Sequence, residues 1–170
     1  MSAMTRPLPP ASVTAGRLLG ARQLANAVRR LAASPSEWLT RVRLNPEGRW
    51  YERIHLDDAY EVWVISWLPG QATGFHDHGG SAGAFSVVWG SLLERRVVGG
   101  MTTGQVHGKL IGAGESRAFG PRYIHDVHNS AASEVAVSVH AYSPPLPLMT
   151  RYDLTPGGLV LTETEGAAAW

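Results

Sequence analysis

Apolar and polar residues recur with two different periods along this chain, and the period changes near residue 49. Before that point the apolar residues follow the 3.6-residue period of an amphipathic helix. They stand at i, i+3, i+4 and i+7: Leu24, Ala27, Val28 and Leu31. A second helix start is indicated by Ser34 as N-cap, Pro35 at the first helical position and Glu37 as the capping-box partner. We therefore expect residues 13–45 to form short N-terminal helices.

From residue 49 onward the apolar residues recur with period two, which is typical of β-strands. Glycine or proline stands at nearly every junction between these runs. Many short strands at regular spacing predict a mainly β fold, either a sandwich or a barrel. The predicted strands lie near 50–56, 61–68, 72–78, 83–90, 91–98, 104–111, 115–119, 123–129 and 134–142, with a weaker pattern after 147.

The proline-rich residues 1–12 are expected to be a disordered leader. The helices of 13–45 are expected to pack on the β portion, residues 46–170, which ends in a C-terminal tail. A length of 170 residues suits one domain with a buried core.

Composition narrows the possible functions. The formal net charge is +1 and no block of Lys or Arg occurs, so nothing points to nucleic acid or to a membrane surface as partner. The chain has no cysteine, which excludes disulfides, zinc–thiolate sites and a cysteine nucleophile. No apolar run is long enough to span a bilayer, and the first residues lack the apolar core of a signal peptide. We expect a cytoplasmic protein.

The stretch "GFHDHGGSAGAF" carries the first candidate chemistry, two histidines one residue apart. Residues two apart on a strand share a face, so His76 and His78 would point the same way. Asp77 would point to the opposite face and is a poor candidate for a ligand. Such a pair also occurs as ordinary polar residues of an edge strand, so the wider context decides.

Two longer segments supply that context. "PGQATGFHDHGGSAGAFSVVWG" resembles the first cupin motif, with Gly70 six residues before the histidine pair and Gly90 closing the hairpin. "GESRAFGPRYIHDVHN" resembles the second motif through Gly114, His125 and Asn129. The resemblance implies a cupin jelly-roll β-barrel with a metal inside it. The implied metal ligands are His76, His78 and His125.

The usual cupin also supplies a glutamate five residues after the second histidine, where this chain has Gly83. Three neutral imidazoles would leave the charge of a metal uncompensated and favour anionic ligands from a substrate. A facial set of protein ligands with open positions suits iron(II) and O2. Zinc accepts three histidines and a water equally well, so the ligand count leaves the metal open. The missing side chain at 83 is also expected to leave room.

The strand "EVAVSVHAY" divides cleanly into two faces, one of which carries Ser138, His140 and Tyr142. An imidazole between two hydroxyls is a potential hydrogen-bond relay. A solvent-facing strand is the simpler interpretation, but the strand begins soon after His125, so the row would lie beside the metal. In "RWYERIHL", Tyr51 and Arg53 also share a face. If that face is inward, the guanidinium requires an anion such as a substrate carboxylate.

Together these segments resemble the cysteine dioxygenase family of thiol dioxygenases, a branch of the cupins, over roughly residues 49–153. The resemblance rests on "WYERI", "HDHGGSAGAF", "IHDVHN" and above all "SVHAYSPPLPLM". It implies Fe(II) on the three histidines and a cis peptide between Ser143 and Pro144. It also implies the relay of Ser138, His140 and Tyr142, with Arg53 and Tyr51 at the substrate carboxylate.

Two departures within the family refine this expectation. Animal members have a cysteine at the place of Gly83, cross-linked to the active-site tyrosine, and this chain has none, as in bacterial members. Relatives that prefer 3-mercaptopropionate commonly have Gln at the place of Arg53. The arginine therefore favours cysteine without excluding other thiol acids.

The expected activity is the oxidation of L-cysteine to cysteine sulfinic acid, with the thiol and O2 as small-molecule partners and a place in cysteine metabolism. One alternative is 3-mercaptopropionate as substrate. Another metal-dependent cupin enzyme would explain the three histidines but not the Ser-His-Tyr row or Arg53. A non-catalytic sensor would predict degraded ligands or a DNA-binding domain. Monomer and homodimer stay open, and no catalytic role is expected for the other histidines: His55, His107 and His128.

Overall fold

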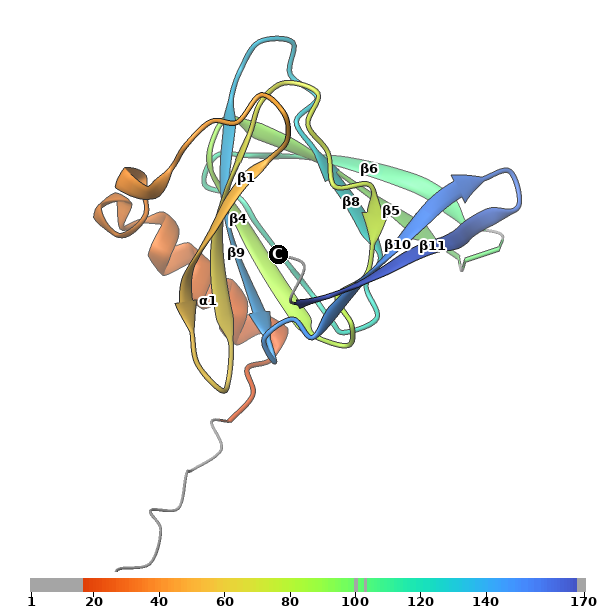
Figure 1. Cartoon of the computed structure of the whole chain (residues 1–170), viewed down its shortest axis with the longest axis horizontal. Coiled ribbons are helices and arrows are strands. Elements are labelled where there is room, and N and C mark those ends of the chain that lie inside the picture. Colours follow the sequence, from red (N-terminus) through yellow and green to blue (C-terminus); the bar gives the residue numbers. More distant parts are fainter. Residues whose placement is uncertain (1–16, 100, 103, 168–170) are drawn as a thin grey trace, which may run out of the picture.

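Two antiparallel sheets face each other in the computed structural model, which describes residues 17–99, 101, 102 and 104–167 (Figure 1). The five-stranded sheet has the order β1 (Trp50–Leu56), β2 (Glu61–Trp67), β9 (Ala136–Ser143), β4 (Ala82–Trp89) and β7 (Ser116–Phe119). The six-stranded sheet has the order β11 (Gly158–Gly166), β10 (Leu148–Thr155), β3 (Phe75–His76), β8 (His125–His128), β5 (Ser91–Val98) and β6 (Gln105–Gly112).

The mainly β class is confirmed, but the expected closed barrel is not formed. Among the described strands, no hydrogen-bonded pairing joins the two sheets into one ring. The sheets are linked instead by chain crossovers such as the β4–β5 turn at Gly90, whose φ of 66° lies in the left-handed region. The weak pattern after residue 147 corresponds to the paired strands β10 and β11.

The strand expected at 72–78 is reduced to the two residues of β3. Gly74 before it has a φ of 69°, and Gly79 after it has a φ of 59°. A left-handed backbone on both sides cannot continue a pleated strand, so the ladder is short. His78 therefore lies just beyond the strand that carries His76.

One helix, α1 (Ala21–Ala32), lies against the outer face of the five-stranded sheet (Figure 1). Its predicted apolar face is confirmed, because Leu24 and Val28 are buried against residues of β2, β4 and β9. The second expected helix is instead two single 3₁₀ turns, η1 (Pro35–Glu37) and η2 (Leu39–Arg41). Ser34 does not cap a helix, since its hydroxyl donates to the carbonyl of Arg30. The predicted leader, residues 1–12, lies outside the described residues.

The main core lies between the sheets, and a second core lies under α1. Strand β9 is covered on both sides and is buried along its whole length. The face of Ser138, His140 and Tyr142 is therefore turned into the space between the sheets, and the solvent-facing interpretation of this row is wrong. The residues of the inter-sheet core are Ile65, Trp67, Phe85, Val87, Leu92, Ile111, Phe119, Val127, Ala136, Tyr142 and Leu146.

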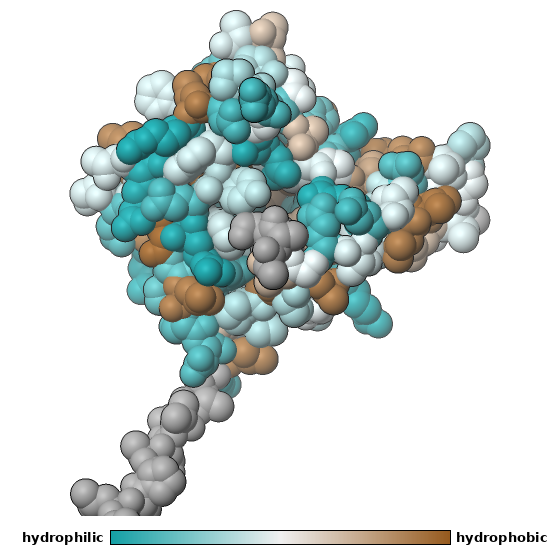
Figure 2. Space-filling view, in the orientation of Figure 1, coloured by the Kyte–Doolittle hydropathy of each residue, from teal (hydrophilic) through white to brown (hydrophobic). Residues whose placement is uncertain are grey.

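No helix in the described part of the chain is long and apolar enough to cross a membrane. Figure 2 shows that hydrophilic side chains cover much of the face that it presents, with apolar residues scattered among them.

Candidate metal centre

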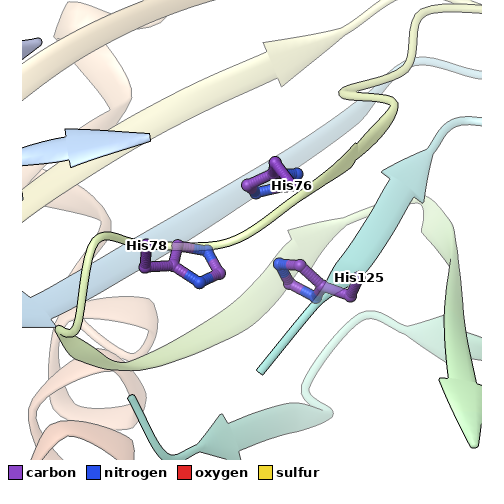
Figure 3. A group of neighbouring side chains, drawn as sticks. All are labelled: His76, His78 and His125. Atoms are coloured by element: carbon purple, nitrogen blue, oxygen red, sulfur yellow. The ribbon is translucent and has the colours of Figure 1, made fainter. Parts of the chain in front are cut away.

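Three buried histidines meet between the sheets and turn their rings toward one another (Figure 3). His76 of β3 and His125 of β8 are direct cross-strand partners, and His78 approaches from the segment after β3. One nitrogen from each ring lies within 4.8 Å of the others. The side chains are 3%, 0% and 2% exposed for His76, His78 and His125. The structure thus brings together the three residues predicted as metal ligands.

Hydrogen bonds fix which nitrogen His76 and His125 can offer. His76 Nδ1 lies 3.0 Å from the carbonyl oxygen of Gly74, and His125 Nδ1 lies 2.9 Å from Glu94 Oε1. Since a carbonyl can only accept, His76 carries its proton on Nδ1 and keeps Nε2 as a free electron pair. Neither nitrogen of His78 has a hydrogen-bond partner in the described part of the chain. A buried polar ring without a partner is costly, and a metal bond would satisfy it.

Burial holds His76 and His78 in the neutral form that binds metals. Burial lowers the pKa of His76 well below its ordinary value, and the proximity of His125 lowers it further. Burial likewise lowers the pKa of His78, followed by the effects of His76 and His125. Since a metal ion competes with protons for imidazole, this environment favours binding at neutral pH. The residues therefore fit a divalent metal.

Glu94 on β5 is a part of this site that the sequence analysis missed. Its carboxylate is 1% exposed, accepts from Arg117 Nε at 2.7 Å and from Tyr123 OH at 3.2 Å, and contacts His125 as above. Burial acts to raise the pKa of Glu94, but the hydrogen bonds from His125 and Arg117 outweigh it, so the net pKa is lowered. A carboxylate behind a ligand histidine orients the ring and increases its basicity.

A signal for Glu94 exists in the sequence. In "SLLERRVV", Glu94 is two residues from Leu92 and so shares its face. Leu92 is fully buried. A charged residue on the same strand face as a core leucine has one of two explanations. Either the alternation of the strand is broken there, or the charge is buried beside another polar group. A cupin with glutamate at position 83 would have a negative charge among its metal ligands. In this chain a negative charge lies instead on Glu94, which contacts His125.

The predicted relay is formed. Ser138 Oγ lies 2.8 Å from His140 Nε2, and His140 Nδ1 lies 3.2 Å from the Tyr142 hydroxyl. Trp67 Nε1 donates to Ser138 Oγ at 2.9 Å. When the Ser138 hydroxyl donates to Nε2, Nδ1 carries the proton and donates to the Tyr142 oxygen. The hydroxyl hydrogen of Tyr142 is then free for another acceptor.

The relay is uncharged at neutral pH. Burial, followed by the charges of His125 and Arg49, lowers the pKa of His140 to about 3. Burial, followed by the charge of Glu61, raises the pKa of Tyr142 above its ordinary value. The Tyr142 ring stacks on His78 with 5.2 Å between centroids, which places the end of the relay beside the histidine cluster.

The room expected at Gly83 does not exist. Gly83 pairs with Phe119 of β7 and with Tyr142 of β9. A Cβ added at Gly83 would overlap the Phe119 ring and lie 3.0 Å from Tyr142 Cδ1. The space is occupied by these two rings, both of which stack on His78. Glycine is favoured here by the close approach of Phe119 and Tyr142, the two rings that stack on His78.

Tyr51 and Arg53 have different surroundings. Tyr51 lines a cavity of about 380 Å³ together with Tyr142 and the unpredicted Arg49. Arg53 is not among the lining residues. Its Nη1 lies 3.4 Å from Glu61 Oε2, its guanidinium lies 5.3 Å from the Trp63 ring centroid, and its side chain is 43% exposed.

The remaining expectations concern residues around the cluster. Asp77 accepts from Tyr152 OH at 2.8 Å and from the Gly79 amide at 3.0 Å, so its carboxylate is used away from the three histidines. The Ser143–Pro144 peptide is cis, as the resemblance implied. His55 pairs with Asp57 on the surface, and neither His107 nor His128 belongs to the cluster.

Comparisons with known proteins find a matching family and similar folds. Residues 13–155 match the family model of cysteine dioxygenase type I. The solved structure of TT1209 from Thermus thermophilus is similar, with 24% identity, a TM-score of 0.54, and coverage of 63% of this chain and 94% of that chain. A conserved protein with a double-stranded β-helix domain from Klebsiella pneumoniae is 20% identical, with a TM-score of 0.52 and coverage of 72% and 90%. A cupin 2 barrel domain protein from Leptotrichia buccalis is 14% identical, with a TM-score of 0.50 and coverage of 62% and 45%. These structures support the cupin fold.

Proposed function

This chain belongs to the cysteine dioxygenase type I family, and from that premise we propose that it is a non-haem iron dioxygenase that oxidises L-cysteine to cysteine sulfinic acid. One observation supports this proposal above all. The buried cluster of His76, His78 and His125 lies directly beside the neutral relay that ends at Tyr142. We also propose that the two sheets are a cupin jelly roll, forming one domain with the N-terminal helix.

The proposed ligands are one nitrogen each from His76, His78 and His125. Fe(II) held there would supply open coordination positions and redox chemistry for a thiolate and O2. The overall reaction is RSH + O2 → RSO2H. The sulfur gives up four electrons and O2 takes up four, so no further reductant is required.

The protein side chains prepare this chemistry. Glu94 holds the His125 ring by its Nδ1 and adds negative charge behind a set of three neutral ligands. The rings of Phe119 and Tyr142 stack on His78 and exclude water from the cluster. Tyr142, held by His140 and Ser138, directs a hydroxyl hydrogen toward an anionic substrate group.

A second candidate substrate is 3-mercaptopropionate. The cavity beside Tyr142 is lined by the cationic side chains of Arg49 and Arg151 and by the carboxylates of Glu163 and Glu165, of which Glu165 bonds Arg151. Guanidinium groups recognise a carboxylate, which cysteine and 3-mercaptopropionate share. The thiol and the acid are thus the two features of the substrate that the site is suited to bind.

Parallel oxidation assays test the proposal. Protein loaded with Fe(II) under anaerobic conditions is exposed to O2 with L-cysteine, 3-mercaptopropionate or cysteamine, and thiol loss and sulfinate formation are measured. We expect cysteine sulfinic acid from L-cysteine, and no product with His76→Ala. Preference for 3-mercaptopropionate would keep the chemistry and change the substrate, whereas no sulfinate from any thiol would contradict the proposal.

A further inference from the structure

The backbone of His78 is held differently from that of the other two histidines of the cluster. His76 lies in β3 and pairs with residues of β10 and β8, and His125 lies in β8. His78 lies beyond the end of β3, and the two residues after it, Gly79 and Gly80, have left-handed φ values of 59° and 92° (Figure 3). Since no strand ladder fixes His78, its position depends on the contacts of its neighbours in the chain.

Asp77, the residue between the two histidines of this segment, makes such contacts with β10. Its amide donates to the carbonyl oxygen of Thr150 at 2.9 Å. Its Oδ1 accepts from the amide of Thr150 at 3.3 Å and from the amide of Gly79 at 3.0 Å. Its Oδ2 accepts from the Tyr152 hydroxyl at 2.8 Å. One carboxylate therefore bonds both to β10 and to the turn that follows His78.

The ring of His78 packs against the opposite sheet. It stacks on Phe119 of β7 and on Tyr142 of β9, with 4.8 Å and 5.2 Å between ring centroids. Asp77 attaches the backbone of the same segment to the six-stranded sheet, through β10. A shift of this backbone would move the His78 ring relative to the other two imidazoles. The bonds of Asp77 therefore bear on the geometry of the cluster.

We infer that Asp77 is a positioning residue for the metal centre, which fixes the backbone of His78 so that its imidazole completes the set of three ligands. The inference rests on the metal site of the proposed function. Asp77 would not touch the metal, since its carboxylate is engaged by β10 and by the turn. Its hydrogen bonds take the place of the strand ladder that holds His76 and His125.

The Fe(II) affinities of Asp77→Ala, Asp77→Asn and Tyr152→Phe test the inference, measured without O2 by competition with a chelator. Asp77→Ala loses all the side-chain bonds, and we expect its affinity to fall about 10- to 100-fold. Asp77→Asn keeps an oxygen that accepts from the amides of Thr150 and Gly79, so it should recover most of the affinity. Tyr152→Phe removes one bond and should show a smaller loss.

Asp57→Ala is the matched control. Asp57 lies between β1 and β2, where its Oδ1 accepts from the amides of Ala59 and Tyr60 at 2.8 Å and 2.9 Å. Each alanine variant loses an aspartate that holds a turn, so urea unfolding should show reduced stability for both. Only Asp77→Ala should lose Fe(II) affinity, because Asp57 does not contact the segment of the metal ligands.

The visible absorption of bound Co(II) shows whether the ligand arrangement itself changes. Its bands depend on the number and geometry of the ligands, so they should shift in Asp77→Ala and stay the same in Asp57→Ala. Unchanged affinity and bands in Asp77→Ala, or an equal loss of affinity in Asp57→Ala, would overturn the inference. If Asp77→Ala does not fold, Tyr152→Phe decides, since weaker Fe(II) binding would support the inference and unchanged binding would overturn it.

These measurements require no turnover, so they separate the inference from the proposed reaction. A wild type that binds Fe(II) more tightly than Asp77→Ala but oxidises no thiol would support the positioning role and contradict the dioxygenase. A wild type that oxidises L-cysteine while Asp77→Ala binds Fe(II) equally well would do the reverse.

Discussion

Glu94 Oε1 lies 2.9 Å from Nδ1 of His125, and both side chains are almost fully buried. This contact connects the candidate metal centre to Arg117 and Tyr123, which also bond the same carboxylate. The negative charge near the three histidines therefore comes from β5, a strand other than those that carry His76 and His125. The site depends on its supporting residues as well as on the three histidines.

Glu94→Gln is expected to weaken metal binding about 10- to 100-fold. The amide keeps the shape of the side chain, but it loses the charge that polarises His125 and pairs with Arg117. Competition with a chelator of known affinity measures the change. Glu52→Gln, at an exposed residue paired with Arg41, is the matched control. Unchanged affinity in Glu94→Gln would show that the contact does not support the ligand.

Gly83→Ala is expected to destabilise the protein by about 1–3 kcal/mol. The added methyl group must displace the rings of Phe119 and Tyr142, and these rings stack on His78. We also expect kcat for thiol oxidation to fall by more than the loss of stability alone would cause, because Tyr142 is displaced. Urea unfolding and kcat measure the two effects. Gly48→Ala, where a Cβ meets nothing within 4 Å, should show neither.

The metal-free protein is expected to lose stability as the pH falls below about 6.5. The pKa of His140 is about 3 in the folded state, against an ordinary 6.5, so between these values the unfolded chain binds a proton that the folded chain does not. This group contributes about 1.4 kcal/mol per pH unit. His76 and His78 act in the same direction.

His140→Gln isolates that contribution. Between about pH 6 and about pH 4.5, the slope of the unfolding free energy against pH should correspond to about one proton fewer in His140→Gln than in the wild type. His107→Gln, at an exposed histidine on β6, is the matched control. An unchanged slope in His140→Gln would mean that His140 titrates alike in the folded and unfolded chain.

His78→Leu is expected to abolish metal binding and to stabilise the metal-free protein by about 1–2 kcal/mol. Both ring nitrogens of His78 are buried without a partner among the described residues, so an apolar side chain removes a desolvation cost. Such a gain is typical of positions kept for function rather than for stability. Thermal unfolding with and without Fe(II) tests both effects. A destabilised His78→Leu that still binds metal would contradict the assignment of a ligand.

The histidine cluster could be predicted because the spacing of its residues in the sequence indicates where their side chains lie. The short separation of His76 and His78 and the second motif around His125 bring three imidazoles to one place. The row of Ser138, His140 and Tyr142 could be predicted because a strand repeats its face every second residue. Its burial could not, since that depends on the six-stranded sheet packing against this face of β9.

The errors have local physical causes. Positive φ values at Gly74 and Gly79 shorten the strand expected around His76, and the period-two pattern cannot reveal them. Ser34 looks like an N-cap, but its hydroxyl bonds back to the preceding helix. Gly83 suggests an empty space when only its own strand is considered. The ring that fills the space belongs to Phe119, which is distant in sequence but pairs with Gly83 in the sheet.

The supporting residues of the site were harder to predict. Glu94 and Arg49 occur in no motif, and only their positions in alternating strand patterns indicate an inward face. Whether such a charge is paired depends on the neighbouring strand. Glu61 pairs with Arg53, and no described carboxylate pairs with Arg49. The register of the strands across the sheet determines which charges are paired, and this register follows from the whole fold.

The most direct test of the central claim is the mass of the product formed from L-cysteine and ¹⁸O2 by the Fe(II)-loaded protein. We predict cysteine sulfinic acid in which both added oxygen atoms are ¹⁸O, with one O2 consumed per thiol and no product from His125→Ala. Cystine as the main product, or a product with one or no ¹⁸O atom, would contradict a dioxygenase.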